Sequence, residues 1–198
     1  MHVTEKKVAI LKSFLDSNVT LIETGTHLGY TSSNCSPFCK AVHTCEINMG
    51  FARQAENTFK NCPNVTLHKE SSYDTLQKIA SGEIATSAPY VFWLDAHMGN
   101  NAEEEKQKIL VKELNIIKDQ FKKENIRALL IDDSCGLKLA SELLTVQECY
   151  DLLLEINPNF RISSILRGGH YNGPTIYDAD VLMAYDADLF DMTIKFRE

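Results

Sequence analysis

The sequence predicts an α/β protein with a doubly wound, mostly parallel sheet of seven strands, an antiparallel last strand and helices on both faces. Short apolar runs and amphipathic stretches alternate five times along the 198 residues, the pattern of a parallel sheet covered by helices. The run YVFWL at residues 90–94 is apolar throughout, as expected for a strand buried on both faces. Two strand-like segments surround the turn-rich RGGHYNGP near the end of the chain, and we expect them to pair antiparallel.

The first half of the chain contains three expected strands, with helices before, between and after them. The strands are expected at residues 19–23, 41–46 and 64–69. Helices are expected at residues 4–17, 48–59 and about 73–81. Thr4 is the expected cap of the first helix, Pro37 should end or kink a short helix, and Gly82 should stop the last of them.

The second half contains four expected strands and two longer helices. The strands are expected at residues 90–95, 127–132, 161–166 and 180–185. The helices are expected at residues 102–124 and 145–156. Thr145 with Glu148 three positions later is typical of a capping box, and Pro158 marks the end of that helix.

Size and composition indicate one domain over residues 1–198. The formal net charge of −7 and the pI near 5.4 leave no large basic surface for nucleic acid phosphates. No stretch approaches the ~18–20 apolar residues of a membrane helix, and no signal core opens the chain, so we expect a cytoplasmic protein without a membrane partner.

Six cysteines in such a chain are expected to be reduced thiols, most of them buried. Cys35, Cys39, His43 and Cys45 could be read as a zinc cluster. Their spacing matches no standard zinc finger, and Pro37 interrupts it, so packing is the favoured interpretation.

The loop after the first strand carries the first indication of a ligand. Its sequence, ETGTHLG at residues 23–29, has glycines where the backbone must turn tightly or approach a ligand. It is not GxGxxG, and the Walker pattern is absent. Glu46 ends the second strand about twenty residues later, where an acidic side chain can accept both hydroxyls of a ribose. These features predict a nucleoside site, although a surface carboxylate is the alternative for Glu46.

ETGTHLG, Glu46 and the LHKESS that closes the third strand resemble the S-adenosylmethionine (SAM) site of class I methyltransferases, which have a Rossmann-like fold. The resemblance spans nearly the whole chain, including the reversed last hairpin. It implies that the first loop faces the methionine part, that Glu46 holds the ribose, and that Glu70 and Ser71 border the adenine. The implied cofactor-binding residues are Glu23, Thr24, Gly25, Thr26, Gly29, Glu46, Ile47, Glu70, Ser71 and Asp95.

Two apolar strands of this topology end abruptly in acidic residues. FWLDAHMGN places Asp95 after the fourth strand, and ALLIDD places Asp132 and Asp133 at the end of the fifth. Adjacent strands lie ~4.8 Å apart, so these carboxylates can converge, provided that the chain bends to turn both neighbours of the pair to one side. A hard divalent cation such as Mg²⁺ would relieve their repulsion. His97 shares the strand parity of Asp95, although capping the next helix is its alternative role.

This acidic corner resembles the metal-dependent sugar O-methyltransferases of the macrolide and aminocoumarin pathways. The resemblance implies Asp95, Asp132 and Asp133 as ligands of Mg²⁺ or Mn²⁺, with His97 as the general base and Asp95 as a second catalytic residue. The chain departs from one branch of that family, which has an Asp at the base position. Catechol methyltransferases use an acid and an amide where this chain has two aspartates.

The predicted function is therefore metal-assisted methylation of a hydroxyl on a saccharide or another small molecule, without a nucleic acid partner. A catechol-like acceptor is the alternative within enzymes. A nucleoside-binding module without turnover is the alternative outside them. Homo-oligomerisation and membership of a larger multidomain protein stay open.

Overall fold

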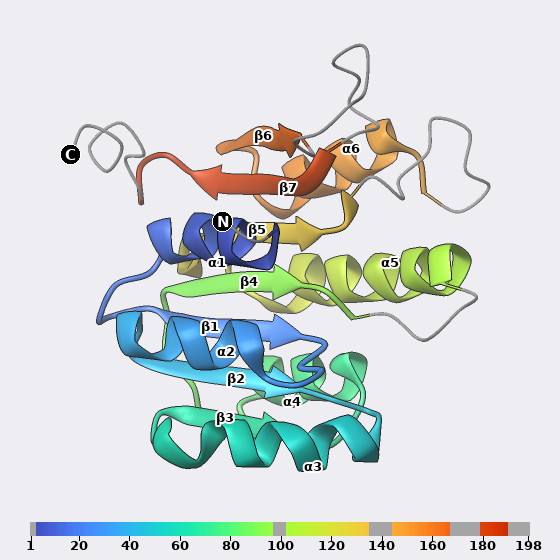
Figure 1. Ribbon diagram of the computed structural model, residues 1–198. Coiled ribbons are helices and arrows are strands. Elements are labelled where there is room, and N and C mark those ends of the chain that lie inside the picture. Colours follow the sequence, from blue (N-terminus) through green and yellow to red (C-terminus); the bar gives the residue numbers. More distant parts are fainter. Residues whose placement is uncertain (1–2, 97–101, 135–143, 167–178, 190–198) are drawn as a thin grey trace.

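The computed structural model describes residues 3–96, 102–134, 144–166 and 179–189, and it contains one seven-stranded sheet. The strand order is β3-β2-β1-β4-β5-β7-β6. The strands are β1 Thr20–Thr24, β2 Ala41–Cys45, β3 Val65–His68, β4 Tyr90–Leu94, β5 Ile126–Asp132, β6 Phe160–Leu166 and β7 Ala179–Asp186. Only β7 runs against its neighbours β5 and β6, as the reversed arrow in Figure 1 shows. The predicted fold class is confirmed.

Helices cover both faces of this sheet (Figure 1). The α-helices are α1 Val3–Ser13, α2 Tyr30–Cys35, α3 Met49–Thr58, α4 Ser72–Ser81, α5 Ala102–Gln120 and α6 Val146–Ile156. Three short 3₁₀ segments are η1 Ser36–Phe38, η2 Phe59–Asn61 and η3 Lys123–Asn125. In the view of Figure 1, α1 and α2 lie in front of the sheet and α4 behind it.

Local signals in the sequence set most helix ends. The Thr145–Glu148 capping box is present at the start of α6, and Gly82 ends α4 in the left-handed conformation, as predicted. Pro37 lies in the 3₁₀ turn that follows α2. The prediction for the first helix was wrong at both ends, because α1 already begins at Val3 and ends at Ser13. Thr4 is therefore inside the helix and does not cap it.

Each face of the sheet carries its own apolar core. On one face, Leu76 of α4, Leu114 of α5 and Leu153 of α6 pack on Phe92 and Leu129. The other core joins α1 and α2 to the opposite sides of the central strands. Its main side chains are Leu11, Phe14, Leu21, Cys35, Val42, Trp93 and Leu130. Burial on both faces explains why the central strands are apolar throughout.

The strand order reverses between β1 and β4. From β1 the chain runs outward to β2 and β3, then returns to β4 on the other side of β1 and continues to β5. In open parallel sheets the loops at the carboxyl ends of the two central strands separate at such a point and leave a crevice for ligands. Among the described residues, no helix has the length and apolar character that crossing a membrane requires.

Candidate functional site

The loop after β1 contacts the end of β4 through its backbone. The backbone amide of Asp95 donates hydrogen bonds to the carbonyl and the hydroxyl of Thr24, at 3.0 and 3.2 Å. Gly25 has φ +89, and a Cβ atom there would lie 2.5 Å from the carbonyl oxygen of Asp95. The first glycine of the loop is therefore required by a backbone approach, which brings β1 and β4 together at the switch point.

The second glycine of the loop has a packing role. Gly29 has φ +79 and precedes α2, and a Cβ atom there would meet the ring of Phe59 at 2.6 Å. Thr26 is buried, and its hydroxyl shares a 2.6 Å hydrogen bond with that of Thr44. These contacts hold the loop against β2 and against the 3₁₀ turn that contains Phe59.

Glu23 lies beneath the loop rather than at its surface. Its side chain is 1% exposed, and its carboxylate accepts hydrogen bonds from the hydroxyls of Ser32 and Thr44. Burial raises the pKa of Glu23 to about 7, although those hydroxyls and that of Thr31 act in the opposite direction. The carboxylate thus ties β1, α2 and β2 together under the loop.

Glu46 stands immediately after β2 and faces the loop. One carboxylate oxygen accepts from the backbone amide of His27 and the other from that of Asn48, both at 2.8 Å. A carboxylate offers about four acceptor positions, so each oxygen can still accept a further hydrogen bond. This arrangement holds both oxygens in fixed positions, as a bidentate contact to two neighbouring hydroxyls requires.

Glu70 and Ser71 connect β3 to α4. The Ser71 hydroxyl caps α4 by accepting from the amide of Asp74, at 3.1 Å. The Glu70 carboxylate accepts from Lys78 and from the hydroxyl of Thr75. Both residues border the crevice, and both have local bonds that hold the turn.

A cavity of about 340 Å³ lies at this edge of the sheet, within the range of small-molecule sites. Five of the predicted cofactor residues line it: Gly25, Glu46, Ile47, Glu70 and Ser71. Glu23, Thr24, Thr26 and Gly29 are not among its described lining residues. Ala96, which follows Asp95, does line it, so the acidic end of β4 adjoins the cavity.

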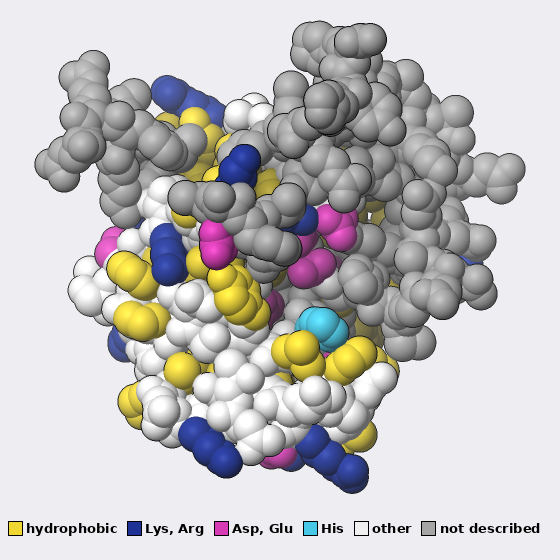
Figure 2. All heavy atoms as spheres, in the orientation of Figure 1, with side chains coloured by type: hydrophobic (Ala, Val, Ile, Leu, Met, Phe, Trp, Pro, Cys, Tyr) yellow, Lys and Arg dark blue, Asp and Glu magenta, His cyan; other side chains and the backbone are white. Residues whose placement is uncertain are grey.

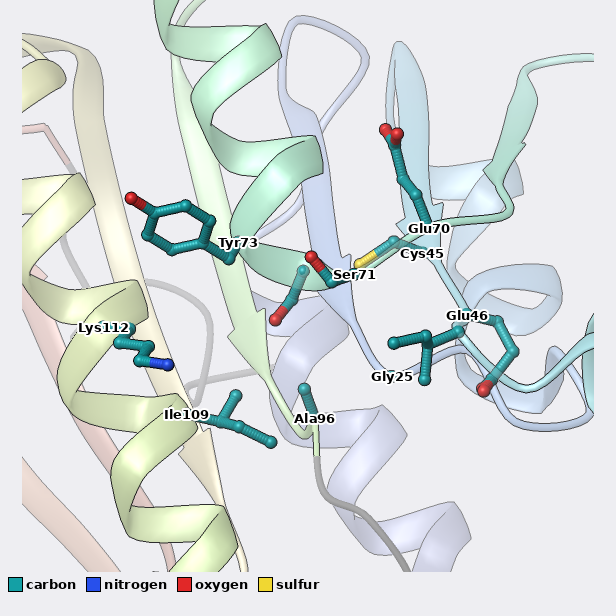
Figure 3. Close-up of a pocket in the computed structure, with 11 residues that line it drawn as sticks. Gly25, Cys45, Glu46, Glu70, Ser71, Tyr73, Ala96, Ile109 and Lys112 are labelled. Atoms are coloured by element: carbon teal, nitrogen blue, oxygen red, sulfur yellow. The ribbon is translucent and has the colours of Figure 1, made fainter.

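Six residues that line the cavity were not predicted from the sequence. Figure 3 shows Tyr73 from α4 and Lys112 from α5 across the cavity from Gly25 and Glu46. The missed lining residues are Cys45, Ser72, Tyr73, Ala96, Ile109 and Lys112. Ser72 and Tyr73 open the helix after β3 and could have been found from that position. Ile109 and Lys112 lie within a long amphipathic helix and carry no signal of their own.

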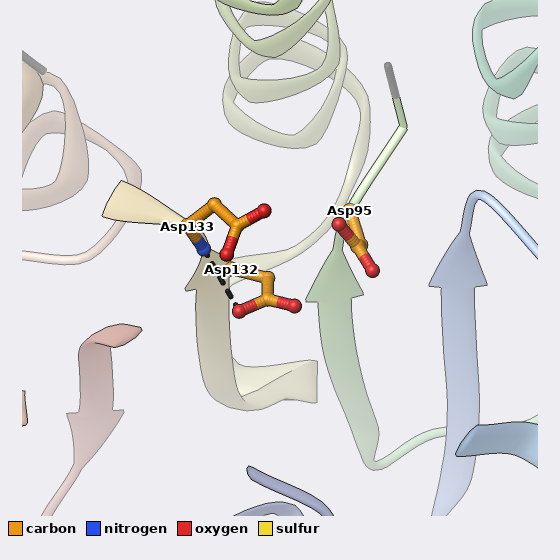
Figure 4. Close-up of side chains that lie close together, drawn as sticks. All are labelled: Asp95, Asp132 and Asp133. Carbon is orange, nitrogen blue, oxygen red and sulfur yellow. Dashed lines mark hydrogen bonds between the residues drawn. The ribbon is translucent and has the colours of Figure 1, made fainter. Parts of the chain in front are cut away.

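Asp95, Asp132 and Asp133 come together beside this cavity (Figure 4). One carboxylate oxygen from each lies within 4.8 Å of the others. Neighbours on a strand normally point to opposite faces, but Asp133 has φ +47, so the chain bends directly after β5. Its backbone amide then donates to the Asp132 carboxylate at 2.8 Å. The predicted convergence of the three acids, which we call the acidic corner, is thus present.

A lysine from the first helix reaches this acidic corner. Lys7 Nζ lies 2.7 Å from Asp132 Oδ1 and 2.8 Å from Asp133 Oδ1. Burial lowers the pKa of Lys7, but its bonds and ion pairs with the two aspartates outweigh burial and raise it above the ordinary value. Burial and the charge of Asp133 raise the pKa of Asp132 against the opposing effect of Lys7.

The donor set of the corner fits a hard divalent cation. Three carboxylates can each offer one oxygen, and Mg²⁺ and Mn²⁺ prefer oxygen ligands while keeping positions for water or substrate. Figure 2 shows acidic side chains grouped beside a basic one at the carboxyl ends of the central strands, open to the surface. His97, the predicted base, lies outside the described residues.

The alternative zinc cluster receives no support. Among the described residues, the group of metal-ligating side chains at suitable distances is the acidic corner. Cys35 and Cys39 instead belong to the apolar core on the α1 face. The five described cysteines are free thiols, and burial raises the pKa of Cys39 to about 11.

Solved structures of methyltransferases share this architecture. An O-methyltransferase from Bacillus cereus in complex with SAH has a TM-score of 0.58 at 16% identity, covering 93% of this chain and 82% of that one. A precorrin-6y C5,15-methyltransferase from Geobacter metallireducens has a TM-score of 0.61 at 12% identity, covering 93% and 90%. An rRNA methylase from Streptococcus thermophilus has a TM-score of 0.58 at 10% identity, covering 94% and 97%. The sequence itself matches no family model and no curated protein.

The chain therefore has the fold of the class I SAM-dependent methyltransferases. At such low identities the likeness concerns the fold alone. The three proteins are named for different acceptors, so the acceptor of this chain has to be argued from its own site.

Proposed function

We propose that this protein is a SAM-dependent O-methyltransferase that acts, with a divalent cation, on a hydroxyl of a sugar or glycosylated acceptor. The single observation that carries the proposal is the convergence of Asp95, Asp132 and Asp133 beside a cavity lined by Gly25 and Glu46. A nucleoside site and a cation site then share the end of β4, where Asp95 and Ala96 are consecutive.

The cofactor is proposed to lie along the cavity at the switch point. Glu46 would accept the two ribose hydroxyls, because its oxygens are held apart by the amides of His27 and Asn48. Ile47, Ser71 and Tyr73 line the part of the cavity proposed for the adenine. The loop at Gly25 would face the methionine part, because Gly25 lines the cavity.

Asp95, Asp132 and Asp133 are proposed to hold Mg²⁺ or Mn²⁺. When bound, SAM supplies an electrophilic methyl group, and the cation supplies a Lewis acid that positions an acceptor hydroxyl and eases its deprotonation. Asp95 would contribute most directly, because its own backbone is bonded to the loop that faces the methyl donor. The three residues would thereby hold an acceptor hydroxyl close to the methyl donor.

His97 is proposed to take the proton of the acceptor hydroxyl as the new oxygen–methyl bond forms and the sulfur–methyl bond breaks. This assignment rests on its place two residues after Asp95 in the sequence. A sugar is preferred over a catechol because the pair at the end of β5 is Asp132 and Asp133, two acids rather than an acid and an amide.

A methyl-transfer assay with labelled SAM tests this proposal. The purified protein is offered two sets of acceptors, nucleoside-free hexose derivatives and catechols, each with Mg²⁺ and each with a chelator. We expect label on a saccharide hydroxyl only when Mg²⁺ is present. Transfer to catechols alone would indicate that the acceptor is a catechol and not a sugar. Tight binding of SAM by calorimetry without turnover on either set would favour the non-catalytic module.

A further inference from the structure

Lys7 links the first helix of the chain to the acidic corner. Its ammonium group lies 2.7 Å from Asp132 and 2.8 Å from Asp133, although the second contact joins residues 126 positions apart in the sequence. The side chains of Lys7 and Asp132 are 14% and 8% exposed, so solvent screens the contact between them only weakly. The side chain of Asp133 is 42% exposed, so its contact with Lys7 is screened more. The corner thus already has a cation that belongs to the protein.

A divalent ion that used the oxygens contacted by Lys7 would compete with its ammonium group. Asp132 Oδ1 accepts from both the Lys7 ammonium and the backbone amide of Asp133. An ion ~2.1 Å from the oxygens that Lys7 contacts would lie within about 5 Å of the ammonium nitrogen. Like charges that close repel strongly in a poorly screened site. A lysine side chain is long and flexible enough to move away from the aspartates, whereas the backbone of Asp132 is held by pairing of β5 with β7.

We propose that Lys7 is the resident counter-ion of the acidic corner and that a divalent ion has to displace its ammonium group in order to bind. This inference rests on the proposed function, since it takes the corner to be the cation site. It implies that α1 lowers the affinity of the acidic corner for divalent ions. It also implies that the contact between Lys7 and the aspartates is lost when an ion binds.

The opposite role for Lys7 makes the opposite prediction. If the ammonium only oriented the aspartates while the ion bound their other oxygens, its loss would weaken the ion by roughly 10- to 100-fold, as for other outer partners of metal ligands. If the ammonium competes, its loss tightens the ion. The sign of the change therefore separates the two roles.

The test compares the Mn²⁺ dissociation constant of the wild type, Lys7→Met and Lys6→Met by calorimetry and by electron paramagnetic resonance of free Mn²⁺. Lys6 is exposed on the same helix and provides the matched control. We expect Lys7→Met to bind Mn²⁺ about tenfold or more tightly than the wild type, and Lys6→Met to equal the wild type. An unchanged or weaker Mn²⁺ affinity in Lys7→Met would overturn the inference.

The same titrations separate this inference from the proposed function. Binding by Lys7→Met but not by the wild type would support the role of Lys7 and overturn metal assistance in the natural protein. Absence of Mn²⁺ binding in both proteins would overturn the inference and the proposed metal assistance. Equal binding in both would overturn the inference and leave the cation site in place.

A measurement on the wild-type protein avoids any folding defect of the variant. Brief reductive methylation followed by peptide mass spectrometry reports how accessible each lysine amine is. We expect Lys7 to be protected in chelator and to become several-fold more reactive with saturating Mg²⁺, while Lys6 reacts equally in both. Equal protection of Lys7 in both conditions would show that the ammonium is not displaced.

Discussion

The backbone amide of Asp133 donates a 2.8 Å hydrogen bond to the carboxylate of Asp132, its own neighbour in the chain. This bond is made at a residue with φ +47, a conformation that few residues other than glycine adopt. The bend turns two consecutive carboxylates to one side, where Asp95 of the adjacent strand completes the acidic corner. A left-handed backbone conformation at one of three facing acids is the kind of strain that clusters at functional sites.

Replacement of Asp132 by Asn should remove the cation from the corner. The substitution keeps the size of the side chain but removes one of three charges, so the Mn²⁺ affinity is expected to fall by at least about 100-fold and methyl transfer to fall with it. Calorimetry with Mn²⁺ and the labelled-SAM assay measure the two effects. Asp119→Asn, an exposed position on α5, is the control. Full activity of Asp132→Asn in chelator would contradict metal assistance.

Replacement of Glu46 by Gln should weaken the cofactor without removing the cation. A hydrogen bond to a charged group contributes about 1.5–3 kcal/mol, so we expect a loss of roughly 10- to 100-fold in SAM affinity by calorimetry. The exposed Glu124→Gln in η3 should bind SAM like the wild type. Unchanged SAM affinity in Glu46→Gln would place the ribose elsewhere.

Gly25→Ala and Gly82→Ala form a matched pair at positive φ. A Cβ at Gly82 has nothing within 4 Å, so that variant should lose only the ~1–2 kcal/mol cost of the left-handed conformation. A Cβ at Gly25 would lie 2.5 Å from the Asp95 carbonyl oxygen, so that variant should be less stable and should also lose SAM affinity. Thermal unfolding and calorimetry distinguish the two; equal SAM binding would show that the loop does not face the cofactor.

The Glu23 carboxyl should make stability fall as the pH rises. Burial raises its pKa to about 7 in the folded protein against 4.5, so the folded state holds its proton more tightly than the unfolded state. Stability from this group is complete below pH 4.5 and is lost as the pH rises through 7, a change of ~3 kcal/mol. Glu23→Gln has no proton to lose. Its stability relative to the wild type, from urea unfolding at several pH values, should therefore increase between pH 5 and 8. A constant difference across that range would rule out a raised pKa.

His97→Ala should impair turnover without preventing cofactor binding. A positioned general base typically contributes ~10²–10⁴ in rate, so kcat should fall by that factor while the SAM dissociation constant stays the same. Activity lost through the missing base should recover in part as the pH rises, because hydroxide can replace it. Full activity of His97→Ala would show that another residue acts as the general base.

The order of elements could be predicted because each one carries its own local signal. Continuous apolar runs gave the central strands, Thr145 with Glu148 gave the start of α6, and Gly82 gave the end of α4. The acidic residues at the ends of β4 and β5 were visible for the same reason, since a carboxylate is out of place after a buried strand. Five of the cavity residues were implied by the resemblance to the SAM site of class I methyltransferases.

The sequence by itself determined which side chains stand at the carboxyl edge of the sheet, because periodicity and turn chemistry act over a few neighbouring residues. Tertiary structure alone decided that β7 lies between β5 and β6, that Asp133 turns toward Asp95, and that Lys112 lines the cavity. It also decided that Lys7 reaches the acidic corner. These contacts join residues far apart in the chain. They depend on how whole helices and strands pack, and local sequence patterns do not predict that packing.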